Sequence, residues 1–218
     1  MSTPAYGERP PAAEPEGLLV LHHGRGTDEH DLLPLADLLD PQRRLHVVTP
    51  RAPLKLPGWP GNHWYVVPRV GFPDPDSFRA SYELLATFHD ELWQRTGVTP
   101  QRTVLGGFSM GSVMSYALAL GHDRPAPAGI LALSGFIPTV EGWRASFEDR
   151  RDLAAWIAHG TEDPVIDVAF ARAARDTLRD AGLAVDYHEF SGGHEIDPML
   201  LAGMRNWLDV RLPAARPA

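Results

Sequence analysis

The sequence predicts an α/β domain in which a mostly parallel, doubly wound sheet is covered by helices on both faces. Short, continuous apolar runs alternate along the chain with longer stretches whose apolar residues recur at helical spacing. Runs without polar alternation suit strands buried on both faces, and alternating strands and helices favour right-handed crossovers. The 218 residues, 44% of them hydrophobic, are enough for one sizeable core.

The N-terminal residues 1–16 are rich in proline, alanine and glutamate. We expect them to form a loose arm, with a short edge strand as the weaker alternative. A single domain is expected over 17–212, followed by a tail over 213–218. Inside the domain, the apolar run at 18–21 suits a buried strand, and the leucines of 28–39 form the stripe of a helix.

The middle of the chain contains a long segment without a regular pattern. After a strand at 45–48, residues 50–76 are rich in proline and show no helical period, which predicts an irregular loop. Loops of this length inside a compact domain are usually functional. A helix over 77–95 follows. The later predicted elements are strands at 129–133, 154–158 and 185–190 and helices over 169–181 and 197–211.

The strongest chemical signal is the segment Gly107-Phe108-Ser109-Met110-Gly111, which reads Gly-x-Ser-x-Gly between a strand-like run and a helix-compatible stretch. A strand that turns sharply into a helix brings backbone close to backbone on both sides of the serine, and glycine has no Cβ to collide there. This context indicates a nucleophile elbow that exposes the Ser109 hydroxyl at the tip of the sheet. The alternative is a glycine-rich turn that merely contains a serine.

A serine becomes nucleophilic when a base takes its proton and a third group orients that base. In an open α/β sheet, reactive groups gather beyond the carboxyl ends of the strands. Asp163 follows the strand at 154–158, and His194 follows the last strand after two glycines. We therefore predict Asp163 as the acid, with Glu162 and Asp167 as alternatives, and His194 as the base. The order serine, aspartate, histidine is that of the α/β-hydrolases.

The tetrahedral intermediate needs N–H donors aimed at its oxyanion, each worth on the order of 100- to 1000-fold in rate. One expected donor is the backbone amide of Met110, the residue after the nucleophile. The other is expected from the glycine-flanked loop after the first buried strand, through the main chain of Arg25. The remaining histidines lack the pattern of a metal site, so no metal and no cofactor are expected.

Composition excludes several classes of protein. Without cysteine, the chain has no disulfides and no cysteine nucleophile. A net charge of −8 argues against nucleic acid or an anionic membrane as the main partner. No stretch approaches 18 apolar residues, and the N-terminus lacks the pattern of a signal peptide, so no membrane span is expected. These features predict a cytoplasmic enzyme with a small-molecule substrate, and they leave a homodimer open.

With these motifs in place, the sequence resembles the phospholipase/carboxylesterase family, which includes the acyl-protein thioesterases. The resemblance covers about residues 17–208. It implies an α/β-hydrolase fold without a large cap domain and serine-dependent hydrolysis of carboxylic esters, sometimes of thioesters. Five motifs carry it: Leu21-His22-His23-Gly24-Arg25-Gly26, Gly107-Phe108-Ser109-Met110-Gly111, Leu133-Ser134-Gly135, His159-Gly160-Thr161-Glu162-Asp163-Pro164-Val165 and Gly193-His194.

The resemblance also concerns the substrate pocket, because Trp64 and Tyr65 look like the family's aromatic pair near the acyl site. Many members have a proline where Asp167 stands and an uncharged residue where Arg25 stands. A charge at the pocket mouth argues against a preference for long acyl chains. Apolar side chains from several segments are expected to wall the pocket, with plain core packing as the alternative for each: Trp64, Tyr65, Phe72, Phe136, Ile137 and Val165.

The sequence thus predicts a carboxylesterase for short to medium acyl chains. Ser109 would attack the ester carbonyl, His194 would accept its proton, and Asp163 would orient the imidazole, with an acyl-enzyme as intermediate. An acyl-protein thioesterase or lysophospholipase would share every catalytic residue. A cofactor-free perhydrolase would differ in the nucleophile that intercepts the acyl-enzyme, and a non-catalytic binding module would be expected to show a broken triad.

Overall fold

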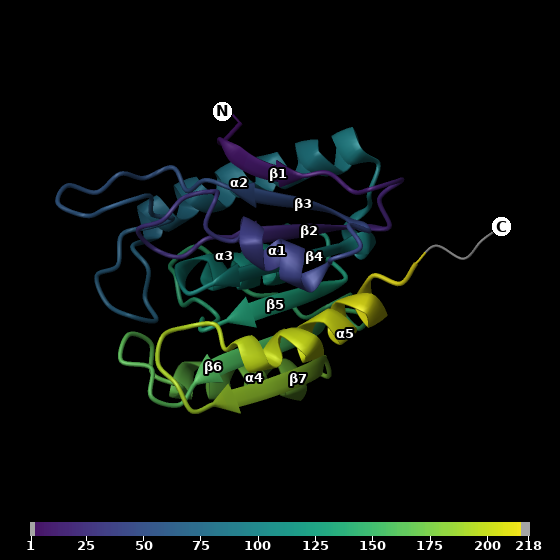
Figure 1. The fold of residues 1–218 in the computed structure, drawn as a ribbon. Coiled ribbons are helices and arrows are strands. Elements are labelled where there is room, and N and C mark those ends of the chain that lie inside the picture. The colour runs from purple at the N-terminus through teal and green to yellow at the C-terminus, as the bar shows by residue number, and fades with distance from the viewer. Residues whose placement is uncertain (1–2, 215–218) are drawn as a thin grey trace.

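The computed structural model describes residues 3–214, and its centre is one seven-stranded sheet (Figure 1). The strand order is β1-β3-β2-β4-β5-β6-β7. Only β1 runs antiparallel to its neighbour, and the other five pairs are parallel. The strands are β1 (Tyr6–Arg9), β2 (Gly17–His22), β3 (Leu45–Pro50), β4 (Thr103–Phe108), β5 (Gly129–Leu133), β6 (Ala154–Gly160) and β7 (Ala184–Phe190).

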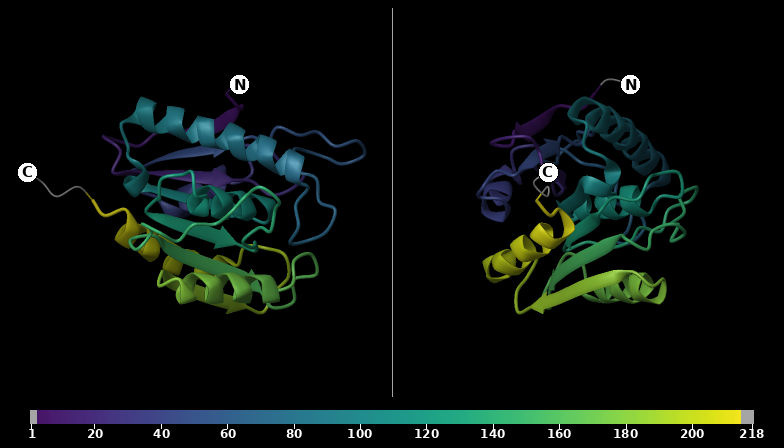
Figure 2. Two further views of the ribbon diagram at one scale, coloured as in Figure 1. Left: turned by 180° about the vertical axis from the view of Figure 1, so that it is seen from behind. Right: turned by 90° about the vertical axis from the view of Figure 1, so that its right-hand side faces the viewer.

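Helices cover both faces of this sheet (Figure 2). Two helices lie on one face, α1 and α5, and three on the other, α2, α3 and α4. Short 3₁₀ helices precede β4 and α5. The helices are α1 (Leu33–Leu39), α2 (Pro75–Thr96), α3 (Met110–Leu120), α4 (Ala169–Asp180) and α5 (Leu201–Arg211), with η1 (Pro100–Arg102) and η2 (Pro198–Leu200).

Two-sided burial explains the apolar strand runs. Leu19 and Leu21 of β2 pack in the core beneath α1 and α5, whereas Leu18 and Val20 pack in the core beneath the other three helices. Every residue of β2, β5 and β6 is buried. An interior strand of this kind has no solvent face, so its sequence shows no polar alternation. The predicted mostly parallel sheet between two layers of helices is confirmed.

The topology gathers the functional segments at one edge of the sheet. Because six strands run in the same direction, their carboxyl ends lie together. The chain moves from β2 to β3 on one side and later to β4 on the other, and ligands of open α/β sheets bind at such a reversal. The irregular segment 50–76, drawn in blue, projects from this same edge (Figure 1).

The expectation of a loose arm over 1–16 is wrong for Tyr6–Arg9, which forms the edge strand β1. Arg9 anchors this strand through a buried ion pair, with its Nη2 2.6 Å from Oδ2 of Asp40. Prolines flank β1 but do not interrupt it, so every residue of the strand retains its N–H. Residues 1–2, and the end of the expected tail from 215 onward, lie outside the described part of the chain.

The helix expected over 28–39 begins later, at Leu33. Pro34 occupies the first turn, and a proline ring would collide with the carbonyl four residues earlier if the helix extended further back. Residues before it instead form turns, in which the Asp28 carboxylate accepts the His30 N–H at 2.9 Å. A leucine stripe therefore predicted the helix correctly but not its start.

A single residue ties the long loop to the segment that follows β2. The backbone carbonyl of Asn62 accepts the Gly26 N–H at 2.9 Å, and its backbone N–H donates to the Thr27 carbonyl at 2.8 Å. Its side-chain amide donates to the Ala52 carbonyl at 2.8 Å. Beside it, a Cβ on Gly61 would lie 2.0 Å from the Gly26 carbonyl oxygen. The two loops are thus joined by backbone contact.

A buried polar network links the sheet to α2 and α3. His22 Nδ1 lies 2.8 Å from Ser115 Oγ, and His22 Nε2 lies 3.4 Å from His89 Nε2. Burial lowers the pKa of His22 to about 3. Burial, followed by the neighbouring His22, also holds the pKa of His89 well below its ordinary value. Both imidazoles are therefore neutral in the folded protein at neutral pH.

These two histidines predict a loss of stability in mild acid. Below about pH 6.5 the unfolded chain binds protons on both imidazoles and the folded chain does not, so the free energy of unfolding is greatest above that pH and falls as the pH is lowered. Each histidine contributes up to about 1.4 kcal/mol per pH unit. In urea unfolding between pH 7 and 4.5, the free energy of unfolding should fall less steeply with decreasing pH in His89→Leu than in the unchanged protein. His30→Gln, at an exposed imidazole, is the control, and an unchanged slope in His89→Leu would contradict the prediction.

Candidate active site

Ser109 occupies a strained turn between β4 and α3. Its φ is 55° and its ψ is −120°, a conformation that residues with a Cβ rarely adopt. The turn is held by the Ser109 N–H, which donates to the Leu133 carbonyl at 2.8 Å. A Cβ on Gly107 would lie 2.5 Å from the Gly111 carbonyl carbon, and one on Gly111 would lie 2.0 Å from the His22 carbonyl oxygen. Both glycines of the motif are therefore required by close backbone approach.

The structure brings the three residues predicted as a triad into one hydrogen-bonded chain. His194 Nε2 lies 2.8 Å from Ser109 Oγ, and His194 Nδ1 lies 2.7 Å from Asp163 Oδ2. The three residues follow β4, β6 and β7, so their contact depends on the shared carboxyl edge of the sheet. The Phe108 ring packs against the imidazole at a centroid distance of 4.9 Å. Only 8% of Ser109 is exposed.

The Asp163 carboxylate is buried and surrounded by donors. Its Oδ1 accepts the backbone N–H groups of Val165 at 2.8 Å and Ile166 at 2.9 Å. Burial by itself would raise the pKa of Asp163, but the hydrogen bonds from His194, Ile166 and Val165 together hold it below its ordinary value. The group therefore stays a carboxylate throughout the neutral range. In this state it can hold His194 Nδ1 as an N–H donor and leave Nε2 free to accept a proton.

The two alternatives for the acid are engaged elsewhere. Glu162 accepts a hydrogen bond from the Ser191 hydroxyl at 3.0 Å, and Asp167 accepts the Ala169 N–H at 2.8 Å near the start of α4. The buried His159, to which the sequence assigned no role, lies beside Asp163. Its Nε2 is 3.2 Å from Asp163 Oδ2 and 2.7 Å from the Ile166 carbonyl oxygen. It braces the loop that carries the carboxylate.

The two residues whose amides are predicted for the oxyanion line the same cavity as Ser109. Met110 is the first residue of α3, where a backbone N–H has no acceptor within the helix and the helix dipole favours negative charge. Arg25 lines the cavity beside it. The next amide in that loop, of Gly26, is already bound to Asn62. Within residues 3–214, the Met110 and Arg25 amides have no protein acceptor, so both can donate to an oxygen bound above Ser109.

Two cavities meet at Ser109. The smaller, of about 80 Å³, contains Met110 and three of the predicted wall residues, Tyr65, Phe136 and Val165. The larger, of about 470 Å³, contains His194 and Phe108. Sequence reasoning missed several apolar residues of the smaller cavity, although they are neighbours in sequence of predicted ones: Val67, Val70 and Ile166.

Three predicted wall residues do not line these two cavities. Trp64 is completely buried, and its indole N–H donates to the His23 carbonyl at 2.9 Å, so it supports the loop after β2. Phe72 is 41% exposed and carries the Arg69 guanidinium 3.7 Å above its ring. Ile137 packs against the core. Aromatic or aliphatic character marks a residue as apolar, but it does not say which neighbour will cover it.

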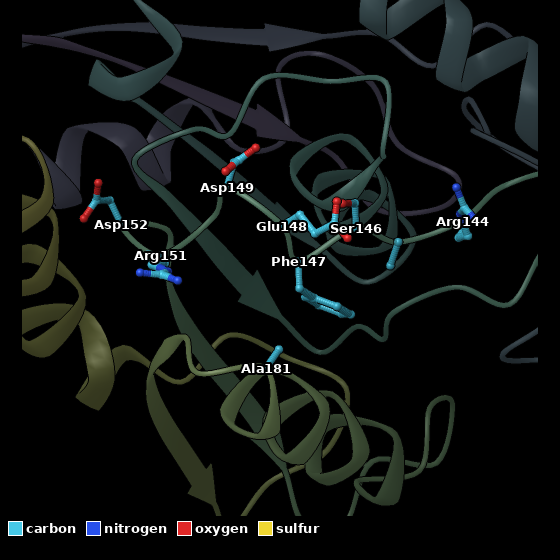
Figure 3. Close-up of a pocket in the computed structure, with 9 residues that line it drawn as sticks. Arg144, Ser146, Phe147, Glu148, Asp149, Arg151, Asp152 and Ala181 are labelled. Atoms are coloured by element: carbon cyan, nitrogen blue, oxygen red, sulfur yellow. The ribbon is translucent and has the colours of Figure 1, made fainter.

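A larger hollow, of about 1030 Å³, lies at the opposite edge of the sheet (Figure 3). Its walls come from residues 144–152, which precede β6, and from Ala181 after α4. Figure 3 shows charged side chains, including Asp149 and Arg151, around an open surface. Ser146 lines it, but no histidine does. This hollow therefore lacks the nucleophile–base pair found at Ser109.

One group of side chains among residues 3–214 has the composition of a cation site. Ligand atoms of Asp28, Glu29 and His30 lie within 4.8 Å of one another. The Glu29 carboxylate is already paired with Arg51, whose Nε lies 2.5 Å from Oε2. A cation would have to compete with this ion pair. None of these three residues belongs to the hydrogen-bonded chain of Ser109, His194 and Asp163.

Comparison with known proteins agrees with this fold. The family model described as Phospholipase/Carboxylesterase matches residues 9–212. Lysophospholipase-like protein 1 of Mus musculus is 25% identical over 184 residues, covering 78% of this chain and 75% of that protein. Acyl-protein thioesterase 1 of Cryptococcus neoformans var. neoformans serotype D is 30% identical over 172 residues, covering 73% and 71%. The Bacillus cereus carboxylesterase structure superposes with a TM-score of 0.81 at 23% identity, covering 96% and 95%.

The architecture is thus an α/β-hydrolase fold, as the sequence predicted. The chain belongs to the phospholipase/carboxylesterase family and is a carboxylic ester hydrolase. Among the residues the structure describes, no helix combines the length and the apolar character that crossing a bilayer requires.

The backbone contact at the elbow predicts a severe effect of Gly111→Ala. The added methyl would overlap the His22 carbonyl, so we expect a loss of about 3 kcal/mol or more in the free energy of unfolding. Gly58→Ala is the control, because its Cβ meets nothing within 4 Å and only its φ of 76° opposes the change. That strain costs about 1 kcal/mol. Equal stability of the two variants in urea unfolding would refute the steric argument.

The hydrogen-bond chain predicts a large effect of Asp163→Asn on turnover. An asparagine can present an N–H to His194 in place of an acceptor, which favours the wrong tautomer of the imidazole. The corresponding change in a serine protease lowers kcat by about 10,000-fold, and we expect a loss of about 1000- to 10,000-fold here. Asp167→Asn, at the alternative acid, should keep activity within about twofold. Ester hydrolysis by both purified variants tests this, and similar losses in the two would reject Asp163 as the acid.

Proposed function

We propose that this protein is a carboxylesterase that acts through Ser109, His194 and Asp163 on esters with short to medium acyl chains. The observation that carries the proposal is the continuous hydrogen-bonded chain from Asp163 to Ser109, with distances of 2.7 and 2.8 Å, opening on two cavities. A serine hydroxyl in this setting loses its proton to the imidazole as it attacks a carbonyl carbon.

The steps follow from the atoms at the site. Ser109 Oγ adds to the ester carbonyl, and the oxyanion accepts hydrogen bonds from the Met110 and Arg25 amides. The alcohol leaves with the proton that His194 had taken, and Ser109 holds the acyl group. Water then enters, gives a proton to His194 and displaces the serine. Asp163 remains a carboxylate and stabilises the imidazolium in both halves of the reaction.

The position of the proton donor indicates which cavity takes the alcohol part of the ester and which takes the acyl part. The leaving oxygen must lie beside His194, so the alcohol part of the ester belongs in the larger cavity, which His194 lines. The smaller cavity contains Ser109 and Met110 but not His194, so it takes the acyl part. We therefore name the smaller one the acyl cavity and the larger one the alcohol cavity.

The size of the acyl cavity supports a short acyl group. An apolar cavity of about 150 Å³ holds benzene, and the acyl cavity has about 80 Å³. Scaled by volume from the six carbons of benzene, it holds about three or four carbons of an acyl chain. Further carbons would extend into solvent.

An acyl-protein thioesterase is the second candidate, because relatives of this chain carry that name. It would use the same catalytic residues, and the wide alcohol cavity of about 470 Å³ would admit a bulky leaving group. The small acyl cavity favours the carboxylesterase, since a long acyl chain would have to leave it after a few carbons.

A series of p-nitrophenyl esters from acetate to palmitate tests the proposal. We expect kcat/KM to be highest between two and six acyl carbons and to be lower for palmitate by about 100-fold, because each methylene beyond the cavity adds little binding. Ser109→Ala should abolish turnover of all of them, whereas Ser146→Ala, at a half-buried serine of the remote hollow, should not. Palmitate as the best substrate would favour the thioesterase, and unchanged turnover in Ser109→Ala would remove the mechanism.

A further inference from the structure

The acyl cavity has an unusual set of polar groups for a site that takes an acyl chain. Apart from the nucleophile, three residues with polar side chains line it, Arg25, Tyr65 and Arg69, and all three side chains are hydrogen-bond donors. No carboxylate or histidine lines it. The remaining walls are apolar. A neutral acyl chain would use only those walls and leave two guanidinium groups without a counter-charge.

The two arginines are held at the rim by aromatic rings. The Arg25 guanidinium lies 4.5 Å from the centroid of Trp59, and that of Arg69 lies 3.7 Å from the centroid of Phe72. Within the described range 3–214, neither side chain forms an ion pair or a hydrogen bond to another protein group. Stacking fixes the plane of a guanidinium while its N–H edge stays available. Both groups are therefore positioned and unpaired in a chain whose net charge is −8.

The tyrosine strengthens this donor set. Tyr65 is almost fully buried, and burial raises the pKa of its hydroxyl, so the phenol keeps its proton. No protein acceptor takes this proton among residues 3–214. A protonated phenol at the wall of a cavity can donate to an anionic oxygen that enters it.

The turn that carries Arg69 is fixed against the rest of the protein. The Phe72 N–H donates to the Arg69 carbonyl at 3.1 Å, and Gly71 between them has a φ of 89°. A Cβ on Gly71 would lie 2.7 Å from the ring of Phe170, which itself packs on Phe136 of the acyl cavity at a centroid distance of 5.3 Å. The position of Arg69 over the acyl cavity thus follows from packing against α4.

The alcohol cavity has the opposite charge. Asp31 and Glu195 line it, and Arg25 reaches it from the boundary between the two cavities, whereas Arg69 belongs to the acyl side alone. An anionic group on the alcohol would face these carboxylates. An anionic group at the end of the acyl chain would face the three donors.

We propose that the preferred substrates are half esters of short dicarboxylic acids, in which the acyl chain ends in a carboxylate and the alcohol is uncharged or cationic. The inference rests on the proposed esterase function and specifies its substrate class. The acyl carboxylate binds between Arg25, Arg69 and the Tyr65 hydroxyl, through charge-assisted hydrogen bonds. With about 80 Å³ of space, a four-carbon diacid fits. The ester C–O bond breaks, the alcohol takes a proton from His194, and water supplies the oxygen of the second carboxylate.

The experiment compares monoethyl succinate with ethyl succinamate, which differs only in having an uncharged amide in place of the carboxylate. We expect kcat/KM for the anionic ester to be higher by about tenfold at low salt, a modest factor because both arginines are solvent-exposed. The preference should shrink in 0.5 M NaCl, because salt screens exposed charges. Release of ethanol, measured enzymatically, gives both rates on one scale.

The decisive readout is the ratio of the two kcat/KM values, which a general loss of activity does not change. Arg69→Gln should lower this ratio by about threefold or more. Arg151→Gln, at an exposed arginine of the remote hollow, should leave it unchanged. Equal rates on the two esters, or a ratio unaffected by Arg69→Gln, would overturn the inference while the esterase function stands. Turnover of both esters by Ser109→Ala would instead reject the proposed function itself.

Discussion

The close approach of α3 to the end of β2 is the contact on which the rest of the site depends. At this point the His22 carbonyl occupies the space that a side chain at Gly111 would need. The first turn of α3 can then start directly beside the loop after β2, so Met110 and Arg25 line one cavity. Ser109, two residues before this contact, has a positive φ of 55°.

The other two residues of the predicted triad reach Ser109 because parallel strands end together. Asp163 and His194 are 31 residues apart in sequence, yet their loops touch after β6 and β7: a Cβ on Gly160 would lie 2.2 Å from the Gly193 carbonyl oxygen. Backbone contact between loops recurs at Gly61 and Gly26. In each case a glycine lets two segments meet without a side chain between them, so backbone contact sets how the two loops lie against each other.

The segment that reaches the acyl cavity from outside the sheet is a different kind of structure. The 50–76 segment is irregular, but its position is determined by contacts to other parts of the chain, through Asn62 to the loop after β2 and through Gly71 to Phe170 of α4. It supplies Tyr65 and Arg69 to the acyl cavity and Trp59 to the stack under Arg25. The predicted triad thus sits at the ends of strands, whereas two of the three donors proposed to bind the acyl carboxylate, Tyr65 and Arg69, come from this loop.

The sequence alone determined the sheet, the helices and the strand ends at which Ser109, Asp163 and His194 stand, because these features follow from local periodicity, glycine placement and chain order. It did not determine the edge strand at Tyr6–Arg9 or the start of α1 at Leu33, which depend on an ion pair with Asp40 and on the ring of Pro34. The pocket was decided only by tertiary structure. Trp64 and Tyr65 are adjacent, yet one supports the loop after β2 and the other lines the acyl cavity, because what covers an apolar side chain comes from residues distant in sequence.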